Sequence, residues 1–154
     1  MATWQMRLVC RACKVPHGPR HALRNRQPTD SSMRVLVAFE DIRYLYRDVF
    51  VRAIRDLRPT LTVRSASLEE LAHVLWHFDP HVVVCSQPSH IHPAGSGAWV
   101  HIPTDDPEED ETLLARICLD GEHWWTEGPP LSEMLEVIDE AHERLREGSL
   151  SEAC

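Results

Sequence analysis

The chain has 154 residues, a formal net charge of −8 and an apolar content of 43%. This length supports one domain with a tail, and this apolar content excludes a wholly disordered chain. No apolar run approaches the roughly 18–20 residues that a membrane-spanning helix needs. The N-terminal residues lack the apolar core of a secretory signal. We therefore expect no membrane partner.

The charge is distributed unevenly along the chain. Residues 1–32 contain one acidic residue, Asp30, and six basic residues, which are Arg7, Arg11, Lys14, Arg20, Arg24 and Arg26. Three prolines and a glycine interrupt any periodic pattern there, so we expect a disordered basic tail. The remainder is more acidic than the total charge suggests. An acidic domain argues against nucleic acid as its partner, because phosphate contacts dominate such affinity.

The five cysteines are Cys10, Cys13, Cys85, Cys118 and Cys154. Their number is odd, and Cys85 and Cys118 lie in apolar runs, where a cysteine usually behaves as a small hydrophobic residue. The pattern predicts a reducing, cytoplasmic compartment.

Residues 33–88 predict the order strand, helix, strand, helix, strand. The strands are expected at 34–39, 61–66 and 81–86, and a Ser67–Glu70 capping box predicts a helix that runs to about Phe78. The apolar positions of the first helix, which we expect to face the core, are Ile42, Leu45, Tyr46, Val49, Phe50, Ala53, Ile54 and Leu57. Two such units with short connections predict parallel pairing, with the first strand between the other two.

Residues 98–148 predict a second set of elements. A strand is expected at 98–102, and strands at 113–119 and 122–126 form a hairpin around Asp120-Gly121. A last helix from Leu131 ends near Gly148, and residues 149–154 are expected to fray. The whole predicts an α/β domain at 33–148. Trp124 and Trp125 should face opposite sides of the sheet, and an exposed tryptophan suggests an interface.

Residues 33–88 resemble the first half of a response-regulator receiver domain. The resemblance rests on the strand 35–39 running into Glu40-Asp41, on the helix with a proline exit, and on the sequence FDPHVVV at 78–84. It implies a flavodoxin-like three-layer sandwich, here with a C-terminal hairpin and helix. The hairpin departs from the family, which has a helix between its fourth and fifth strands.

The resemblance also implies roles for residues at the strand ends. Glu40 and Asp41 match the acidic pair that binds Mg²⁺ in the family, and Thr104 stands in its hydroxyl position. The phosphoacceptor position falls on Ser86, which is not a carboxylate. The family's lysine is missing, because Lys14 in the tail is the only lysine of the chain. An acyl phosphate needs a carboxylate nucleophile and a compensating cation, so the usual phosphotransfer is not expected.

Other groups of residues suggest further chemistry. Asp41 is expected to cap the following helix, as an alternative to a Mg²⁺ site that it forms with Glu40. His90 and His92 follow the third strand, where they could join Glu40, Asp41 and Ser86 in a mixed metal site. Four residues with zinc-type side chains lie in the tail, namely Cys10, Cys13, His17 and His21, at a spacing shorter than in ordinary fingers.

Two functions fit these observations. The first is a non-catalytic, receiver-like signalling or interaction module that binds a protein partner or forms a homodimer, and that needs no cofactor. The alternative is a small metal-dependent or hydrolytic enzyme that uses Glu40, Asp41, Ser86 and the His90/His92 pair.

Overall fold

The computed structural model describes residues 32–88, 96–103, 114–128 and 131–154. The domain they belong to spans Ser31–Cys154. The basic tail predicted at 1–32 lies outside these ranges except for Ser32. Within them, no helix is both long and apolar enough to cross a membrane.

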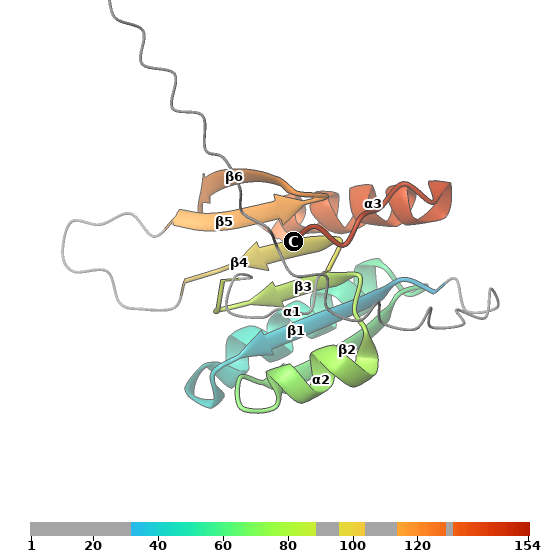
Figure 1. Cartoon of the computed structure of the whole chain (residues 1–154). Helices are drawn as coiled ribbons and strands as arrows, with labels where there is room; N and C mark the ends of the chain where they lie inside the picture. The colour runs from blue at the N-terminus through green and yellow to red at the C-terminus, as the bar shows by residue number, and fades with distance from the viewer. Residues whose placement is uncertain (1–31, 89–95, 104–113, 129–130) are drawn as a thin grey trace, which may run out of the picture. The chain divides into compact units, whose positions relative to one another are not determined.

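A six-stranded mixed sheet forms the centre of the domain (Figure 1). Its strands are β1 (Arg34–Phe39), β2 (Thr62–Ser67), β3 (Val82–Cys85), β4 (Ala98–His101), β5 (Leu114–Leu119) and β6 (Glu122–Glu127). The order across the sheet is β2-β1-β3-β4-β5-β6. The first four strands are parallel, whereas β5 is antiparallel to β4 and β6 is antiparallel to β5. The predicted place of the first strand, between the second and the third, is therefore confirmed.

The far half of the sheet differs from a flavodoxin-like sheet. That fold has the order 2-1-3-4-5 with parallel strands, whereas here β5 reverses direction and β6 adds a further edge. The predicted hairpin joins β5 to β6 and explains their antiparallel pairing. Asp120 and Gly121 both have positive φ, at 54° and 83°, as a two-residue type I′ turn requires. The α/β class is confirmed.

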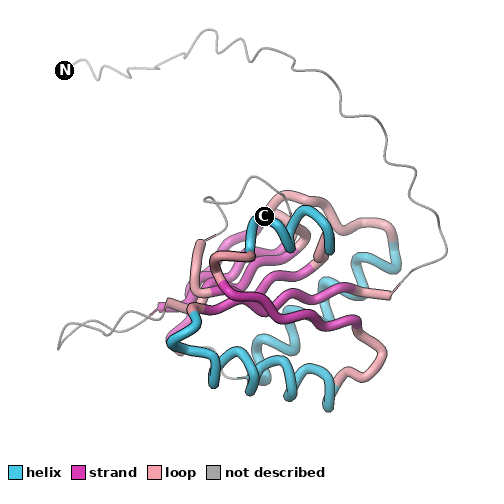
Figure 2. The backbone as a smooth tube through the Cα atoms, turned by 90° about the horizontal axis from the view of Figure 1, so that it is seen from below, coloured by secondary structure: helices cyan, strands magenta, loops and turns pink. Residues whose placement is uncertain are grey.

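Helices cover both faces of the sheet (Figures 1 and 2). Side chains of a strand alternate between faces, so Val35, Val37 and Phe39 of β1 lie in one core cluster and Leu36 and Ala38 in the other. The first cluster includes residues of α1 (Tyr44–Leu57) and α3 (Leu131–Glu147). The second includes residues of α2 (Leu71–Phe78).

The ends of α2 and α3 follow the predicted local chemistry. Ser67 Oγ accepts the Glu70 N–H at 3.4 Å, and the Glu70 carboxylate accepts the Ser67 N–H at the same distance, which is the reciprocal pair of a capping box. The pair closes the turn before α2, which begins at Leu71 and has no side-chain cap hydrogen bond of its own. Asp79 adopts a left-handed conformation directly after α2. Gly148, with φ of 71°, ends α3.

The orientation of the first helix was predicted wrongly. The segment is helical, as a short 3₁₀ turn η1 (Asp41–Arg43) continued by α1. Its residues Val51, Ile54 and Phe50 face the core. The ring centre of Phe50 lies 5.7 Å from that of Phe39. Phe50 and Ile54 were predicted correctly, and Ala53 is half-buried. The other five predicted core positions are exposed, namely Ile42, Leu45, Tyr46, Val49 and Leu57.

Candidate functional site

The carboxyl ends of β1, β3 and β4 lie at the same end of the sheet, on the left in Figure 1. We call this end, with the residues that directly follow the strands, the rim. Glu40 directly follows β1, and Ser86 directly follows β3. Because β1 and β3 are paired, the two residues leave the sheet on neighbouring strands. The Ser86 N–H still donates to the Ala38 carbonyl at 3.3 Å. The structure therefore brings together two of the four residues predicted at this rim.

The rim does not supply an activated nucleophile among the described residues. Ser86 Oγ is buried and has no hydrogen-bond partner there, whereas a nucleophilic serine needs a base within hydrogen-bond reach. Burial, opposed by the hydrogen bond from the Gln87 N–H and assisted by the nearby charge of Glu40, raises the pKa of the Cys85 thiol to about 12. At neutral pH Cys85 is a protonated core residue.

Asp41 does not cap the helix, which corrects the prediction. It is the first residue of η1, and neither η1 nor α1 has a side-chain cap hydrogen bond. Its carboxylate lies 3.7 Å from the guanidinium of Arg47, which is turned inward and only 21% exposed. Arg47 Nε is buried and lies 3.8 Å from Asp48. Asp41 of the acidic pair therefore lies beside Arg47.

The remaining predicted ligands lie outside the described ranges. These residues are Thr104, His90, His92, Cys10, Cys13, His17 and His21. Across the ranges that are described, no group of three or more His, Cys, Asp or Glu side chains is arranged to hold a metal ion. The Mg²⁺ site at Glu40 and Asp41 stays a prediction.

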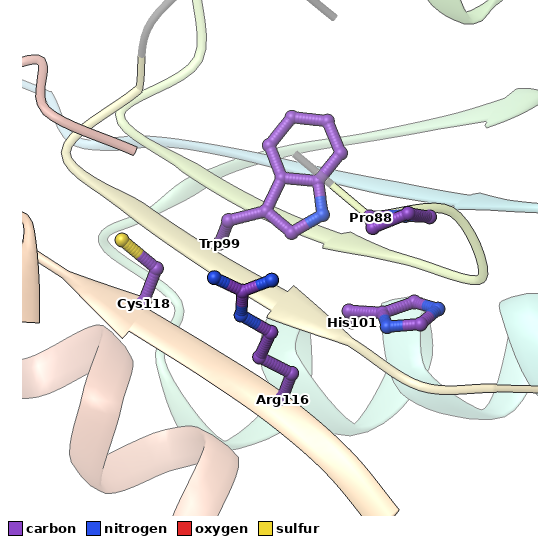
Figure 3. A pocket seen from close by; sticks show the side chains of 5 residues that line it. All are labelled: Pro88, Trp99, His101, Arg116 and Cys118. Carbon is purple, nitrogen blue, oxygen red and sulfur yellow. The ribbon is translucent and has the colours of Figure 1, made fainter. Parts of the chain in front are cut away.

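A shallow hollow lies on the face of the sheet that α2 covers in part (Figure 3). Its lining residues are Pro88, Trp99, His101, Arg116 and Cys118. Trp99 pairs with Cys118 and His101 with Arg116 across β4 and β5, so all four side chains share one face. The hollow encloses no space for even a water molecule, whereas small-molecule sites have roughly 300–1,000 Å³. It is a shallow depression of the surface and not a binding cavity.

Two residues that line the hollow also hold the segment that follows β3. Trp99 Nε1 donates to the Gln87 carbonyl at 2.8 Å, and His101 Nε2 lies 3.1 Å from the Ser86 carbonyl. Trp125 lies beside the hollow and is 61% exposed, with the Arg116 guanidinium 5.4 Å from its ring centre. The prediction that one of the two neighbouring tryptophans is exposed is confirmed. Strand alternation would have placed Arg116 on the same face as Cys118 and Trp125, and we did not use that signal.

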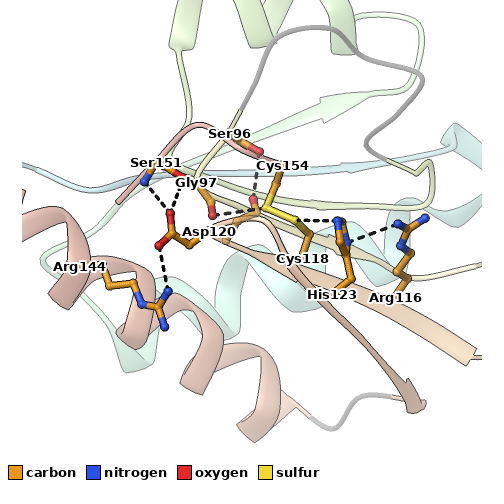
Figure 4. The surroundings of a disulfide bond; sticks show 10 residues. Ser96, Gly97, Arg116, Cys118, Asp120, His123, Arg144, Ser151 and Cys154 are labelled. Atoms are coloured by element: carbon orange, nitrogen blue, oxygen red, sulfur yellow. Dashed lines mark hydrogen bonds and ion pairs between the residues drawn. A yellow bond between two sulfur atoms is a disulfide. The ribbon is translucent and has the colours of Figure 1, made fainter. Parts of the chain in front are cut away.

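The C-terminal segment contacts the domain where we expected a frayed tail (Figure 4). Cys154 forms a disulfide with Cys118 of β5, and its N–H donates to the Ser96 carbonyl at 3.0 Å. Ser151 donates its N–H and its hydroxyl to Asp120. These bonds from Ser151, together with Arg144 at 3.1 Å, lower the pKa of the Asp120 carboxyl. Treating Cys118 as a simple hydrophobic residue was therefore wrong.

Exposed apolar side chains gather on the outward side of η1 and α1. Ile42 is 86% exposed, Leu45 and Val49 are each 63% exposed, and Tyr46 is 56% exposed. We call these four residues the α1 outer face. They follow the spacing i, i+3, i+4 and i+7, so they lie side by side on the helix.

The apolar arc of this helix is wider than the sheet can cover. With about 100° between successive residues, the apolar positions from Leu45 through Val49 to Ile54 span about half of the helix circumference. A helix that packs on one surface typically shows an apolar stripe of about 100°. The helix therefore has one apolar side for the core and a second that faces solvent.

Comparisons of the chain with models of known protein families, with curated protein sequences and with solved structures find no match. The α1 outer face, the rim and the hollow are accordingly interpreted from their own chemistry.

We expect Cys85 to resist alkylation in the native protein. With a pKa of about 12, its reactive thiolate is present at about one part in ten thousand at pH 8. Incubation with iodoacetamide followed by peptide mapping should leave the Cys85 peptide unmodified, and the same treatment in guanidinium chloride should label it fully. Stoichiometric native labelling at Cys85 would show that the rim is open to solvent there.

We expect the Cys118–Cys154 disulfide to contribute strongly to stability. It closes a loop with a sequence separation of 36, for which the chain-entropy model gives about 4 kcal/mol at 25 °C. Cys154→Ser should lower the free energy of unfolding in urea by about that amount. Reductant should destabilise the wild type equally and leave the variant unchanged. Identical wild-type curves with and without reductant would contradict the bond.

Proposed function

We propose that the protein is a non-catalytic, receiver-like interaction module that binds another protein through the α1 outer face. The observation that carries this proposal is the exposure of Ile42, Leu45, Tyr46 and Val49 on one side of one helix. Contiguous apolar surface of this kind marks an interaction site in a folded protein. Aromatic residues such as Tyr46 are enriched in the buried parts of interfaces.

The first part of the sheet supports the receiver-like scaffold. Four parallel strands in the order β2-β1-β3-β4 carry an acidic residue, Glu40, at the end of β1 and Ser86 at the end of β3. Ser86 cannot form the acyl phosphate that a carboxylate forms. On this proposal the scaffold serves recognition, and its use is in signalling or in assembly.

The enzyme alternative gains no support from the described residues. The hydroxyl of Ser86 is buried without a hydrogen-bond partner there, and the hollow is smaller than a substrate pocket. We therefore do not propose a hydrolytic reaction. Nucleic acid remains an unfavoured partner, because the chain carries a net charge of −8.

The compartment stays a prediction. The odd cysteine count favours the cytoplasm, but the Cys118–Cys154 disulfide weighs against it, because cytosolic glutathione and thioredoxin keep most thiols reduced.

We expect the protein not to accept a phosphoryl group. Incubation with acetyl phosphate and Mg²⁺ should leave the intact mass without a stoichiometric phosphoryl adduct, because Ser86 stands where the receiver family has its phosphoacceptor aspartate. Heat-denatured protein, treated in the same way, controls for nonspecific acetylation. Stoichiometric phosphate uptake at any residue of the native protein would overturn the non-catalytic proposal.

We expect a photo-crosslinker on the α1 outer face to capture a protein partner. A benzoylphenylalanine at Leu45 should give one dominant adduct in the cells that make the protein, and Leu45→Glu/Val49→Glu should weaken the same complex by roughly tenfold or more. The same crosslinker at exposed Glu122, on the edge strand β6, is the control. Equal adducts from both positions would show that the α1 outer face is not a specific surface.

A further inference from the structure

We infer that the partner of the α1 outer face is a second copy of this chain, packed with the two α1 helices antiparallel. This inference rests on the proposed function and names its partner. It starts from the charges that border the apolar residues. Asp41, at the start of the helical segment, is 77% exposed, and Arg52, about two turns beyond Tyr46, is 85% exposed.

The sign of these charges changes along the helix. Asp41 and Asp48 lie before and beside the apolar residues, and Arg52 lies one turn after Val49. Asp56 follows one turn beyond Arg52, outside the stretch that carries the four apolar residues. A parallel copy would place acid against acid and base against base. An antiparallel copy places each Arg52 near the partner's Asp41, once on either side of the two-fold axis. Complementary charge on a self-complementary patch is what a two-fold interface requires.

The four residues of the α1 outer face also fit a two-fold axis. An axis that passes between Leu45 and Tyr46 sets Ile42 of one copy against Val49 of the other, and Leu45 against Tyr46. The two larger tyrosines then lie next to the axis, each against a leucine, and the β-branched residues pair at the two ends. Helix pairs that interlock in this way approach to 8–10 Å between axes.

The existing contacts of these charges do not prevent the new ones. Asp41 lies 3.7 Å from Arg47, and Arg52 lies 3.6 Å from Asp56 on the same helix. Exposed pairs of this kind contribute little to stability, so both side chains can turn toward a partner.

The size of the patch sets the expected strength of the dimer. Four apolar side chains supply a few hundred Å² at most, comparable to the largest patch on an ordinary monomer, while a standard interface takes about 800 Å² from each partner. We therefore expect dissociation in the micromolar range, with the flanking charges setting orientation more than affinity.

A charge-exchange experiment on the full chain tests the inference. Sedimentation equilibrium should show a wild-type dimer between about 1 and 200 µM, the range of such weak interfaces. Asp41→Arg and Arg52→Glu should each weaken it by roughly tenfold or more, because each reversal creates two like-charge contacts. An equimolar mixture of the two variants should recover a dimer, since the arginine introduced into one chain then meets the glutamate introduced into the other.

Control variants separate orientation from general surface effects. Glu122→Arg, on β6, should leave the dimer unchanged, and Leu45→Glu/Val49→Glu should abolish it while the unfolding transition stays in place. A monomeric wild type would overturn the inference, as would single reversals whose mixture stays monomeric.

The crosslinker at Leu45 identifies the occupant directly. In a mixture of isotopically light and heavy full-length protein, the inference expects mixed-isotope adducts between two α1 helices. Adducts to residues 1–31 of the same chain would overturn it, with that segment as the occupant. Adducts only to a different protein would overturn the dimer as well, but they would leave the proposed function standing. The proposed function itself fails only if the α1 outer face captures no protein specifically or if the chain takes up phosphate.

Discussion

Burial of β1 on both of its faces is the constraint on which the rest of the domain depends. Every residue from Val35 to Phe39 is buried, and the strand is hydrogen-bonded to β2 on one side and to β3 on the other. A strand in this position needs apolar cover above and below, because its side chains alternate between faces. The chain supplies α1 and α3 for one face and α2 for the other. Each helix is held where its side chains reach β1 or its neighbours.

That requirement fixes the rotation of α1 and creates its second apolar side. Val51 and Ile54 must face the sheet, and burying an aliphatic side chain contributes about 1.5–3 kcal/mol. Rotating the helix so that Ile42 and Leu45 face inward would expose Val51 and Ile54. It would bury no additional apolar surface, because the first turns of the helix lie beside the rim and not over the sheet. Arg47 takes the inward position there. The exposed apolar side is therefore a consequence of core packing and is not a local misfit.

How much of this could be predicted from sequence depends on the range of the interaction. The order of the first three strands, the Ser67–Glu70 cap and the Asp120-Gly121 turn follow from local patterns, and they were found. The rotation of α1 was not, because eight apolar positions over half of the circumference fit either side of the helix equally well. The Cys118–Cys154 bond was not found either, since it joins residues with a sequence separation of 36 that only the fold brings together.

The candidate rim shows the same division. A carboxylate and a hydroxyl at neighbouring strand ends were predictable from parallel pairing, and Glu40 and Ser86 lie there. What the sequence could not supply is the environment of each group. The pKa of Cys85 is raised by burial, Ser86 Oγ is enclosed, and Asp41 is drawn toward Arg47. The surroundings of Cys85 and Ser86 depend on the packing of the whole domain, and those of Asp41 depend on the inward position of Arg47 on the same helix. Local sequence patterns do not specify any of these three environments.

Asp41 connects the rim with the surface that we propose as an interface. A divalent cation at the rim would need its carboxylate beside that of Glu40, whereas the antiparallel dimer needs the same carboxylate beside the partner's Arg52. One side chain cannot satisfy both, so cation binding and dimerisation would oppose each other, and linkage requires each to weaken the other by the same factor. In the structure the Asp41 carboxylate already lies beside an arginine of its own helix. This position is compatible with the proposed interface, and Asp41 is a residue for which the sequence left a helix cap and a metal ligand as alternatives.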